Sequence, residues 1–345
     1  MRVLVTGATG YIGGRLVPLL LEAGHEVRCL SRDPGRLDGA RWRARVEAAR
    51  GDVLDPASLG DALAGCDAAY YLVHAMAEGA GFDERDRQGA VNFREAAAAA
   101  GLQRIVYLGG LAPEGAPLSK HLDSRHEVGR ILGDGPTPVT EFRAAVIIGS
   151  GSLSFEMLRY LTEVLPLMTT PRWVRNRCQP IAVGDVLSLL VRALDDPEPV
   201  SRVLQIGGPD VLTYQEMMRA YAEEVGLHRV IIPVPFLTPR LSSLWVGLVT
   251  PLPPSVARPL VESLRSEVVV RDDGAQQVFP YEPLPFREAL RLALSTSPDT
   301  AAAPGAAPSP SPAQPAPGDP EWSGGRVFTD RQVVPVPIRT GERLS

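Results

Sequence analysis

The stretch Val3–Gly14 reads VLVTGATGYIGG and decides the fold. It opens with β-branched and apolar residues, as in a buried strand, passes through Gly7, Gly10 and Gly13, and continues at once into a helical pattern. In such a unit the first glycine permits the tight turn, the second lets the backbone approach a pyrophosphate, and the third lets the helix pack closely on the strand. The helix N-terminus then offers free N–H groups to the phosphates. The stretch therefore predicts a dinucleotide-binding turn.

Short β-branched runs alternate with amphipathic or alanine-rich stretches along most of the chain. This alternation is typical of a parallel sheet covered by helices on both faces, so the predicted fold class is α/β, a Rossmann-type doubly wound sheet. Strands are expected near Arg2–Thr6, Glu26–Leu30, Val46–Arg50, Ala68–Val73, Arg104–Leu108, Val139–Arg143 and Val203–Ile206. Helices are expected near Ile12–Ala23, Ala57–Ala64, Phe82–Ala100, Leu122–Leu132, Leu153–Val164, Asp185–Leu194, Thr213–Val225, Pro254–Leu264 and Phe286–Leu294.

Composition suggests how the chain is divided. Residues 1–150 are expected to form the dinucleotide-binding Rossmann domain, and residues 151–294, where prolines accumulate, a smaller substrate lobe interleaved with it. Residues 295–320 are rich in Ala, Pro, Ser and Gly and are expected to be a disordered linker. Residues 321–345 are too few to bury a core of their own. The segment Asp319–Asp330 resembles the start of a START-like ligand-binding domain, which implies a truncated domain at this end.

Charge and cysteine content exclude several classes of protein. The chain has 35 basic and 40 acidic residues and a net charge of -5, which gives no basic field for nucleic acid or anionic lipid. Cys29, Cys66 and Cys178 are odd in number and widely spaced, so they predict neither a disulfide framework nor a metal site. Prolines interrupt the apolar stretch Leu241–Leu260, and the first residues predict a strand rather than a signal peptide. We therefore expect a cytoplasmic protein with a small-molecule partner, without a transmembrane segment, and the sequence leaves its oligomeric state open.

Several motifs together resemble the extended and atypical branches of the short-chain dehydrogenase/reductase superfamily. The resemblance covers about Met1 to Leu294. Within the superfamily the chain looks most like the NAD(P)-binding group that includes NmrA-like proteins and the complex I 39-kDa subunit. The motifs that carry it are TGATGYIG at Thr6–Gly13, GDVLD at Gly51–Asp55, NFREAAAAAGLQRIVYLGG at Asn92–Gly110, FRAAVIIGSG at Phe142–Gly151, IAVGDV at Ile181–Val186 and IGGPDVLTYQEM at Ile206–Met217.

The resemblance implies a cofactor, NADP or NAD, and the residues that would contact it. Asp52 and Val53 would face the adenine, and Leu72 and Val73 would pass beside the nicotinamide ribose. The cofactor-binding residues expected in the turn are Gly7, Thr9, Gly10, Tyr11, Ile12 and Gly13.

The second strand ends in Ser31 and Arg32, where an NAD-preferring fold usually places an acidic residue on the ribose 2′-hydroxyl. Arg32 can pair with a 2′-phosphate instead, which favours NADP. Asp33 follows at once and can counter this effect, and a solvated surface charge is the alternative interpretation of Arg32.

The usual catalytic set of the superfamily is absent. Its reductases use Tyr-x-x-x-Lys with a serine upstream, in which the tyrosine donates a proton and the lysine lowers the pKa of the phenol. Here Ser119–Leu132 reads SKHLDSRHEVGRIL, which places His121 at the tyrosine position and Arg125 at the lysine position. The serine is replaced by Gly109–Gly110. We predict that His121 donates a proton and that Arg125 holds the ribose, against the alternative that both have structural roles.

Two further histidines bear on this site. His74 follows an apolar run at the end of the fourth strand, where ligands gather in open α/β sheets, so it is a third catalytic candidate. The alternative is a hydrogen-bonded structural histidine. His126 is expected to point elsewhere on its helix and to be exposed.

Other polar and aromatic residues have simpler interpretations. Tyr11, Tyr70, Tyr71 and Tyr107 are expected in the core, and Asp185 is expected to cap a helix N-terminus. The loop Thr170–Pro180 carries Arg172, Arg175 and Arg177 around Trp173 and could clamp an anionic substrate, although a solvated loop explains it as well.

The functional prediction is an NAD(P)-dependent oxidoreductase or epimerase-like enzyme with NADP favoured. The alternative is a non-catalytic NAD(P)-binding redox sensor or regulatory or assembly protein, which the missing Tyr-Lys pair favours. The fold by itself does not separate the two.

Overall fold

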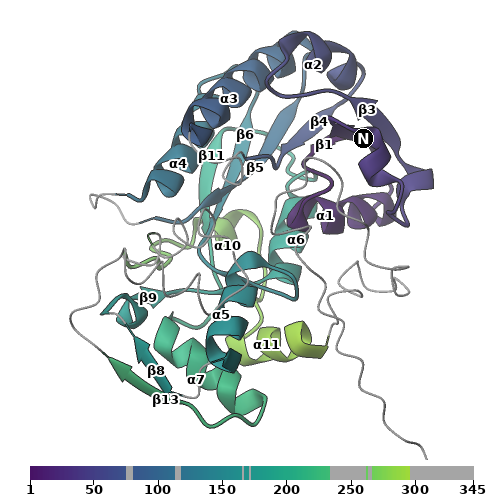
Figure 1. The fold of residues 1–345 in the computed structure, drawn as a ribbon. Helices are drawn as coiled ribbons and strands as arrows, with labels where there is room; N and C mark the ends of the chain where they lie inside the picture. The colour runs from purple at the N-terminus through teal and green to yellow at the C-terminus, as the bar shows by residue number, and fades with distance from the viewer. Residues whose placement is uncertain are drawn as a thin grey trace, which may run out of the picture.

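A computed structural model describes residues 1–74, 81–112, 118–164, 167–170, 172–233, 262 and 266–295. Its centre is a seven-stranded sheet in the order β11-β6-β5-β4-β1-β2-β3, in which every neighbouring pair is parallel (Figure 1). The strands are β1 (Arg2–Thr6), β2 (Glu26–Ser31), β3 (Glu47–Arg50), β4 (Ala68–Tyr71), β5 (Arg104–Gly110), β6 (Val139–Ala144) and β11 (Arg202–Ile206). This arrangement confirms the predicted Rossmann-type α/β class. The strand order reverses between β1 and β4, which is where doubly wound sheets bind their ligands.

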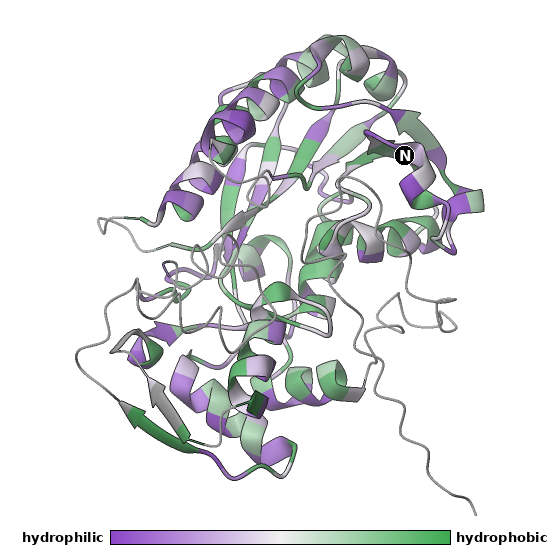
Figure 2. Ribbon diagram, viewed as in Figure 1, coloured by the Kyte–Doolittle hydropathy of each residue, from purple (hydrophilic) through white to green (hydrophobic). Residues whose placement is uncertain are grey.

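Helices cover both faces of the sheet because its strands are apolar on both sides. Val3 and Val5 of β1 pack in the core beneath α1 (Tyr11–Glu22) and α6 (Val183–Arg192), whereas Leu4 between them packs on the opposite side. That opposite face is covered by α2 (Pro56–Leu63), α3 (Phe82–Ala99) and α4 (Lys120–Gly133). Figure 2 shows hydrophilic residues along α3 and α4, whereas α1 is mostly hydrophobic.

Two buried arginines tie strands to helix ends. The Arg28 guanidinium donates to the carbonyls of Ala62 and Ala64, 2.8 Å away at the end of α2, and Arg104 donates to the Ala193 carbonyl at the end of α6. The last carbonyls of a helix have no partner within the helix, so these guanidinium groups satisfy them. This accounts for two charged side chains that are less than 10% exposed.

A smaller lobe lies beyond the end of the sheet at which the chain leaves β6 (Figure 1). Its core joins α5 (Leu153–Val164), α7 (Tyr214–Glu224) and α11 (Phe286–Ser295). A short helix, α10 (Gly274–Val278), packs under the main sheet instead. Two-stranded pairs complete this half: β7 (Ile147–Ile148) with β10 (Ile181–Ala182), β9 (Arg177–Cys178) with β12 (Leu212–Thr213), and β8 (Leu167–Thr170) with β13 (Val230–Pro233).

The sequence predicted all seven strands of the main sheet and missed the short elements. Single turns such as η1 (Pro34–Leu37), η2 (Arg43–Arg45) and η4 (Arg172–Arg175), and the two-residue strands, are too short to leave a periodic pattern. The predicted helix Pro254–Leu264 and the predicted segments 295–320 and 321–345 lie outside the described residues, apart from residue 262 and from Ser295, which ends α11.

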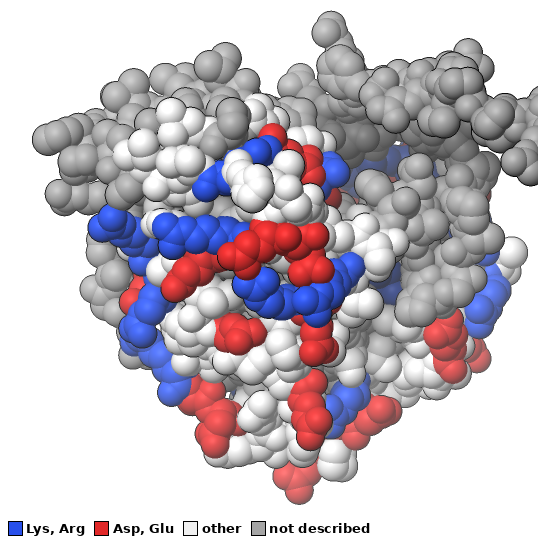
Figure 3. Space-filling model, turned by 90° about the horizontal axis from the view of Figure 1, so that it is seen from below, with Lys and Arg blue, Asp and Glu red and all other residues white. Residues whose placement is uncertain are grey.

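The face of the lobe seen in Figure 3 carries acidic and basic side chains next to one another. Two of the ion pairs on the lobe join α11 to α7, Arg287 with Glu223 at 2.6 Å and Arg291 with Glu224 at 2.7 Å. In the part of the chain that the structure describes, no helix has the length and apolarity needed to cross a membrane.

Candidate functional site

The glycine turn lies at the switch point between β1 and β4. Gly7 has a φ of +70°, a conformation that side chains rarely adopt, and a Cβ there would lie 2.6 Å from the Leu72 carbonyl oxygen. The Thr6 hydroxyl joins the same two strands, since it donates to the Tyr70 carbonyl at 3.0 Å and accepts from the Leu72 N–H at 2.9 Å. The turn and the residues that follow β4 therefore form one rigid edge of the sheet.

The start of α1 is suited to phosphate oxygens. Gly10 is the residue before the helix, no side chain caps the exposed N–H groups, and the first turn holds no acidic residue. Thr9 and Gly10 are exposed, whereas Gly13 is buried so closely against the turn that a Cβ would lie 2.9 Å from the Cα of Ala8. A backbone cradle at the positive end of a helix whose first turn carries no carboxylate fits a pyrophosphate. Ile12 is partly buried and packs on the core beneath.

Tyr11 turns its phenol into the protein. Its hydroxyl is buried beside Gly149 and has no hydrogen-bond partner among the described residues, and burial raises the pKa of the phenol to about 12. The Arg15 guanidinium lies 3.9 Å from the centre of the Tyr11 ring and donates to the Ser150 carbonyl at 3.0 Å. Tyr11 therefore joins the turn to the segment that leads into the lobe.

Two arginines lie where β2 and β3 end, at the same edge of the sheet as the glycine turn. The parallel register pairs Ser31 with Arg50, and both Arg32 and Arg50 are exposed. The Asp33 carboxylate accepts the Gly35 N–H at 3.1 Å and so caps η1. The Ser31 hydroxyl donates to the Asp33 carbonyl at 2.8 Å.

The two residues expected at the adenine are held by their neighbours. The Asp52 carboxylate accepts the Leu54 N–H at 3.0 Å, and the carbonyl of Val53 accepts the Asn92 side-chain amide at 2.9 Å. Asn92 is a buried residue of α3 that sequence reasoning missed, because an amide in an alanine-rich helix carries no distinctive spacing.

The three catalytic candidates lie together although they come from two elements. The rings of His74, after β4, and His121, in the first turn of α4, are 6.2 Å apart in an edge-to-face arrangement. Arg125 lies one helical turn beyond His121. Burial, followed by the Arg125 cation and His74, lowers the pKa of His121 to about 3. His74 is accessible to solvent, and the surrounding protein and Arg125 lower the pKa of its imidazole as well.

These shifts change the predicted role of His121. With its pKa well below 7, the imidazole is neutral at physiological pH. A neutral imidazole at this place can donate a hydrogen bond but has no imidazolium proton to transfer.

Residues of α4 bind three groups near the end of β5. The Tyr107 hydroxyl donates to the Arg125 carbonyl at 3.0 Å, and the Arg125 guanidinium donates to the Leu108 carbonyl. The Nε2 atom of His126 lies 2.9 Å from the Gly110 carbonyl oxygen. The expectation that His126 is exposed is wrong, because this contact holds the ring half-buried against β5.

A side chain at either of the two glycines that stand at the expected serine position would require a neighbouring side chain to shift. A Cβ on Gly109 would lie 2.6 Å from a carboxylate oxygen of Glu141, and one on Gly110 would lie 2.7 Å from the Leu122 side chain. Glu141 is buried and holds Arg143 through contacts of 2.7 and 3.2 Å. This pair was not predicted from the sequence, although an acidic and a basic residue two positions apart in a strand share one face.

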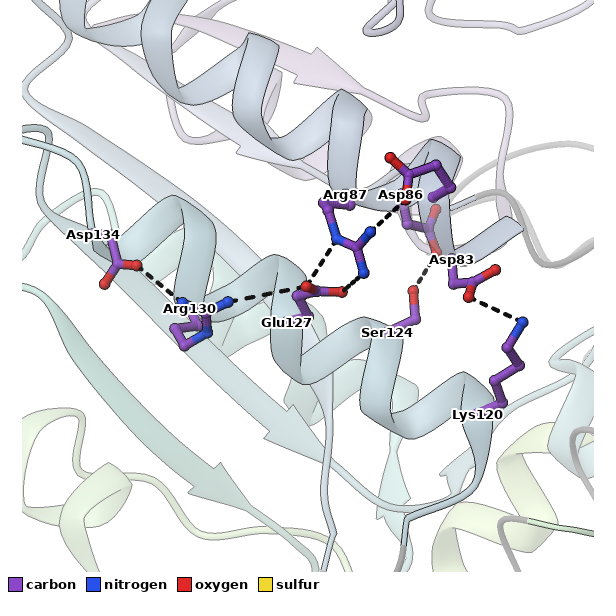
Figure 4. A network of polar contacts seen from close by, with 9 residues as sticks. Asp83, Asp86, Arg87, Lys120, Ser124, Glu127, Arg130 and Asp134 are labelled. Atoms are coloured by element: carbon purple, nitrogen blue, oxygen red, sulfur yellow. Dashed lines mark hydrogen bonds and ion pairs between the residues drawn. The ribbon is translucent and has the colours of Figure 1, made fainter. Parts of the chain in front are cut away.

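A polar seam between α3 and α4 fixes the helix that carries His121 and Arg125 (Figure 4). The buried Asp86 carboxylate accepts the Ser124 hydroxyl at 3.0 Å. Arg87 donates from Nε and Nη2 to the two carboxylate oxygens of Glu127, at 2.9 and 3.1 Å. The single lysine of the chain, Lys120, forms an ion pair with Asp83 at 2.9 Å and belongs to the same seam.

Two expectations about the lobe need correction or refinement. Asp185 does not cap the N-terminus of α6, because the helix begins two residues earlier and the Asp185 carboxylate accepts the Leu284 N–H instead, at 2.9 Å. In the arginine loop, Arg177 lies in β9 and pairs with Glu267 at 2.7 Å, whereas Arg175 is exposed. The side chains of residues 172 and 173 lie outside the described part.

Comparison with known proteins identifies the cofactor domain. Residues 7–133 match the NAD(P)H-binding family. The chain is similar to the (4-alkanoyl-5-oxo-2,5-dihydrofuran-3-yl)methyl phosphate reductase of Streptomyces griseus, with 28% identity over 269 residues that cover 76% of this chain and 85% of that protein. For five other curated relatives, the match spans 24–33% of the relative's own length.

Two solved structures have the same fold. The triphenylmethane reductase of Citrobacter sp. in complex with NADP(H) superposes with a TM-score of 0.68 at 20% identity and covers 85% of this chain and 100% of its own. The NADPH-dependent quinone oxidoreductase of Escherichia coli in complex with NADPH gives a TM-score of 0.66 at 17% identity, over 84% of this chain and 100% of its own. These findings show that residues 7–133 belong to the NAD(P)H-binding family and that the chain has the fold of these two proteins.

Proposed function

We propose that this protein is an NADP-dependent reductase whose active site is formed by His74, His121 and Arg125. The observation that carries the proposal is that these three side chains meet beside the edge that joins Gly7 to Leu72. NADPH, when bound, supplies a hydride to an acceptor. Two of the similar proteins catalyse reductions: the (4-alkanoyl-5-oxo-2,5-dihydrofuran-3-yl)methyl phosphate reductase of Streptomyces griseus and the quinone oxidoreductase of Escherichia coli. Their activities support this class of reaction.

In this proposal each group of cofactor residues contacts a different part of NADPH. The N–H groups in the first turn of α1, after Gly10, bind the pyrophosphate, and Gly7 and Gly13 keep the backbone close enough to do so. Asp52 and Val53 face the adenine, and Leu72 and Val73 line the nicotinamide ribose.

Arg32 and Arg50 would select NADP. They lie at the ends of neighbouring strands, and a 2′-phosphate between them could accept from both guanidinium groups. The Asp33 carboxylate accepts the Gly35 N–H and caps η1, and the two guanidinium charges outweigh its single negative charge. A preference for the phosphorylated cofactor follows from this balance of charge.

Arg125 and the histidines would then act on the acceptor. Arg125 is anchored to the Leu108 carbonyl, which leaves guanidinium N–H groups for a ribose hydroxyl or for the acceptor's oxygen. His121 orients the acceptor through its N–H, and the Asp86–Ser124 contact holds the helix that carries it.

Calorimetric titration with NADPH and NADH tests the proposal. We expect NADPH to bind more tightly than NADH and to be oxidised when acceptors are added. If neither nucleotide binds, the proposed function is wrong.

A redox sensor without turnover is the second candidate. It is favoured by one observation: the chain's only lysine is paired with Asp83 in the α3–α4 seam, so the Tyr-Lys pair of the superfamily is missing. A sensor would bind NADPH and NADP⁺ with unequal affinity and would oxidise NADPH with none of the acceptors tested. Thermal shifts measured with each nucleotide, beside an acceptor screen, separate the two candidates.

A further inference from the structure

The chain has five histidines, and two of them meet at the candidate site. The rings of His74 and His121 are 6.2 Å apart between centres, with an angle of 65° between their planes. In the described part of the chain neither ring makes a hydrogen bond with another residue, whereas the Nε2 atom of His126 lies 2.9 Å from the Gly110 carbonyl oxygen. The ring nitrogens of His74 and His121 therefore remain available to an acceptor or to water.

The missing hydrogen bonds leave the tautomers of these two rings free. A neutral imidazole carries a proton on one nitrogen and accepts at the other, and the bonds that the ring makes decide which nitrogen is protonated. His126 has such a bond, which places its proton on Nε2. No contact within the described residues favours one tautomer of His74 or His121 over the other.

The surroundings keep both rings neutral. Burial, then the Arg125 cation and then His74 lower the pKa of His121 to about 3, and the surrounding protein and Arg125 lower the pKa of His74 as well. Neither ring therefore holds two protons at neutral pH. A proton passes through such a ring only if the ring gives up one proton as it gains another.

We propose that His121 and His74 form a neutral two-histidine proton relay, through which solvent supplies the proton that the oxygen of a carbonyl acceptor takes up. This inference rests on the proposed reductase function. The hydride forms a new C–H bond at the carbonyl carbon, the π pair moves to the oxygen, and NADPH is oxidised to NADP⁺.

The proton moves in the same step. The oxygen takes the N–H proton of His121, the other nitrogen of His121 takes a proton from His74 through water, and His74 takes one from solvent. Each ring ends as its other neutral tautomer and returns to the first by exchange with water. The acceptor becomes an alcohol, and no imidazolium forms.

The positions of the rings set their order in the relay. His121 is 8% exposed and lies one helical turn from Arg125, whose guanidinium can bind the same oxygen, whereas His74 is exposed and exchanges protons with solvent. With the ring centres 6.2 Å apart, nitrogens of the two rings are more than about 3.5 Å apart in any orientation, so a bridging water joins them.

Arg125 is less suited than His121 to supply the proton. An imidazole N–H and a guanidinium are both stronger acids than an alcohol, so either can protonate an alkoxide. Arg125 would lose its charge by doing so, and its contact with the Leu108 carbonyl offers no proton in return. His121 regains its proton from His74, which leaves the Arg125 cation in place to stabilise the oxygen.

The first test needs the protein alone. With 15N-labelled histidine, 1H–15N spectra that detect couplings across the ring report which nitrogen holds the proton. Between about pH 5 and pH 8 we expect His74 and His121 to be neutral, with each tautomer populated to at least about 10%. His126, the control, should hold its proton on Nε2 only. A single tautomer of His121, or an imidazolium at neutral pH, would overturn the inference.

The second test follows proton transfer during turnover. NADPH oxidation is measured with 4-nitrobenzaldehyde, acetophenone and cyclohexanone, whose reduced products are alcohols, and the fastest is used in mixtures of H2O and D2O. We expect kcat/KM of the wild type to depend on the D2O fraction along a curve, because more than one proton moves in the same step. The dependence should become linear in His74→Gln. The same curve in both proteins would remove His74 from the relay.

Chemical rescue separates a relay from a structural role. His74→Ala should lower kcat by at least about tenfold, with NADPH affinity unchanged in calorimetry. Added imidazole should restore the rate, whereas 1-methylimidazole should not, because it has no N–H to pass on. His228→Gln, at an exposed histidine of the lobe, should behave as the wild type.

The outcomes distinguish this inference from the proposed function. A full rate in His74→Ala, equal rescue by both imidazoles, or NADPH binding without reduction of any of the three carbonyl compounds would overturn the relay alone. Failure to bind NADPH in calorimetry would overturn the proposed function.

Discussion

His74 and His121 face each other edge to face, with ring centres 6.2 Å apart, although one follows β4 and the other begins α4. Both imidazoles lie near the Arg125 guanidinium, which disfavours a second positive charge. The pair is therefore held as neutral donors at the end of the sheet where a ligand of this fold binds.

Cofactor choice depends on the arginines at the ends of β2 and β3. Arg32→Ala and Arg50→Ala should each weaken NADPH binding by about tenfold, or about 1.4 kcal/mol, and leave NADH affinity nearly unchanged. Calorimetry with both cofactors measures this. Arg45→Ala, an exposed arginine of η2 near the opposite strand ends, is the matched control. An unchanged ratio of affinities in both variants would remove these arginines from cofactor selection.

The turn should reject any side chain at Gly7. Gly7→Ala forces a Cβ to within 2.6 Å of the Leu72 carbonyl and strains a φ of +70°, so it should lower the free energy of unfolding by about 1–3 kcal/mol. NADPH binding should fall with it. Gly39→Ala is the control, because a Cβ there has open space and an ordinary φ. Chemical denaturation provides the comparison, and equal stability of the two variants would contradict the tight turn.

Variants of His121 and Arg125, both in α4, should differ in their effects on turnover and on NADPH binding. His121→Ala should lower kcat by about 10²–10³ with NADPH affinity unchanged, because it removes a donor to the acceptor. Arg125→Ala should weaken both, because it also loses a ribose contact. Steady-state kinetics with the best acceptor and calorimetry measure the two effects. A His121→Ala enzyme with full kcat would make His74 the next candidate.

Stability should depend on pH through His121. Its folded-state pKa, about 3, lies below the usual value of 6.5, so the unfolded chain binds a proton first as the pH falls. The stabilising effect of the neutral form is complete above about pH 6.5 and is lost as the pH falls toward 3. Urea denaturation at pH 7 and pH 5 should show a smaller loss of stability for His121→Gln than for the wild type. The same loss in both proteins would mean that His121 ionises normally.

Glu141 should stabilise the protein through its buried ion pair with Arg143. Its carboxylate is 2% exposed and neutralises Arg143, so Glu141→Ala leaves that cation half-buried and unpaired. We expect a loss of about 3 kcal/mol in the free energy of unfolding. Glu95→Ala, which breaks an exposed pair with Arg94, should cost less than about 1 kcal/mol. Thermal and urea denaturation check both values, and similar small losses would show that the buried pair adds little.

The sequence by itself determined the central fold and the cofactor turn. The spacing of Gly7, Gly10 and Gly13 after an apolar strand has few structural solutions, because each glycine answers a local requirement for space or backbone conformation. The alternation of strands and helices then predicted the seven-stranded sheet, since that periodicity is also local.

Tertiary structure alone decided which polar groups meet and what charge they carry. His74, His121 and Arg125 were singled out one by one, but their meeting depends on the packing of α4 on β5 through Tyr107 and His126. The neutral state of His121 follows from its burial beside Arg125, which no spacing in the sequence encodes. The same reason explains why Asp185 was misassigned: its partner is a backbone N–H 99 residues away, and long-range contacts of this kind are set by the packed chain rather than by its local pattern.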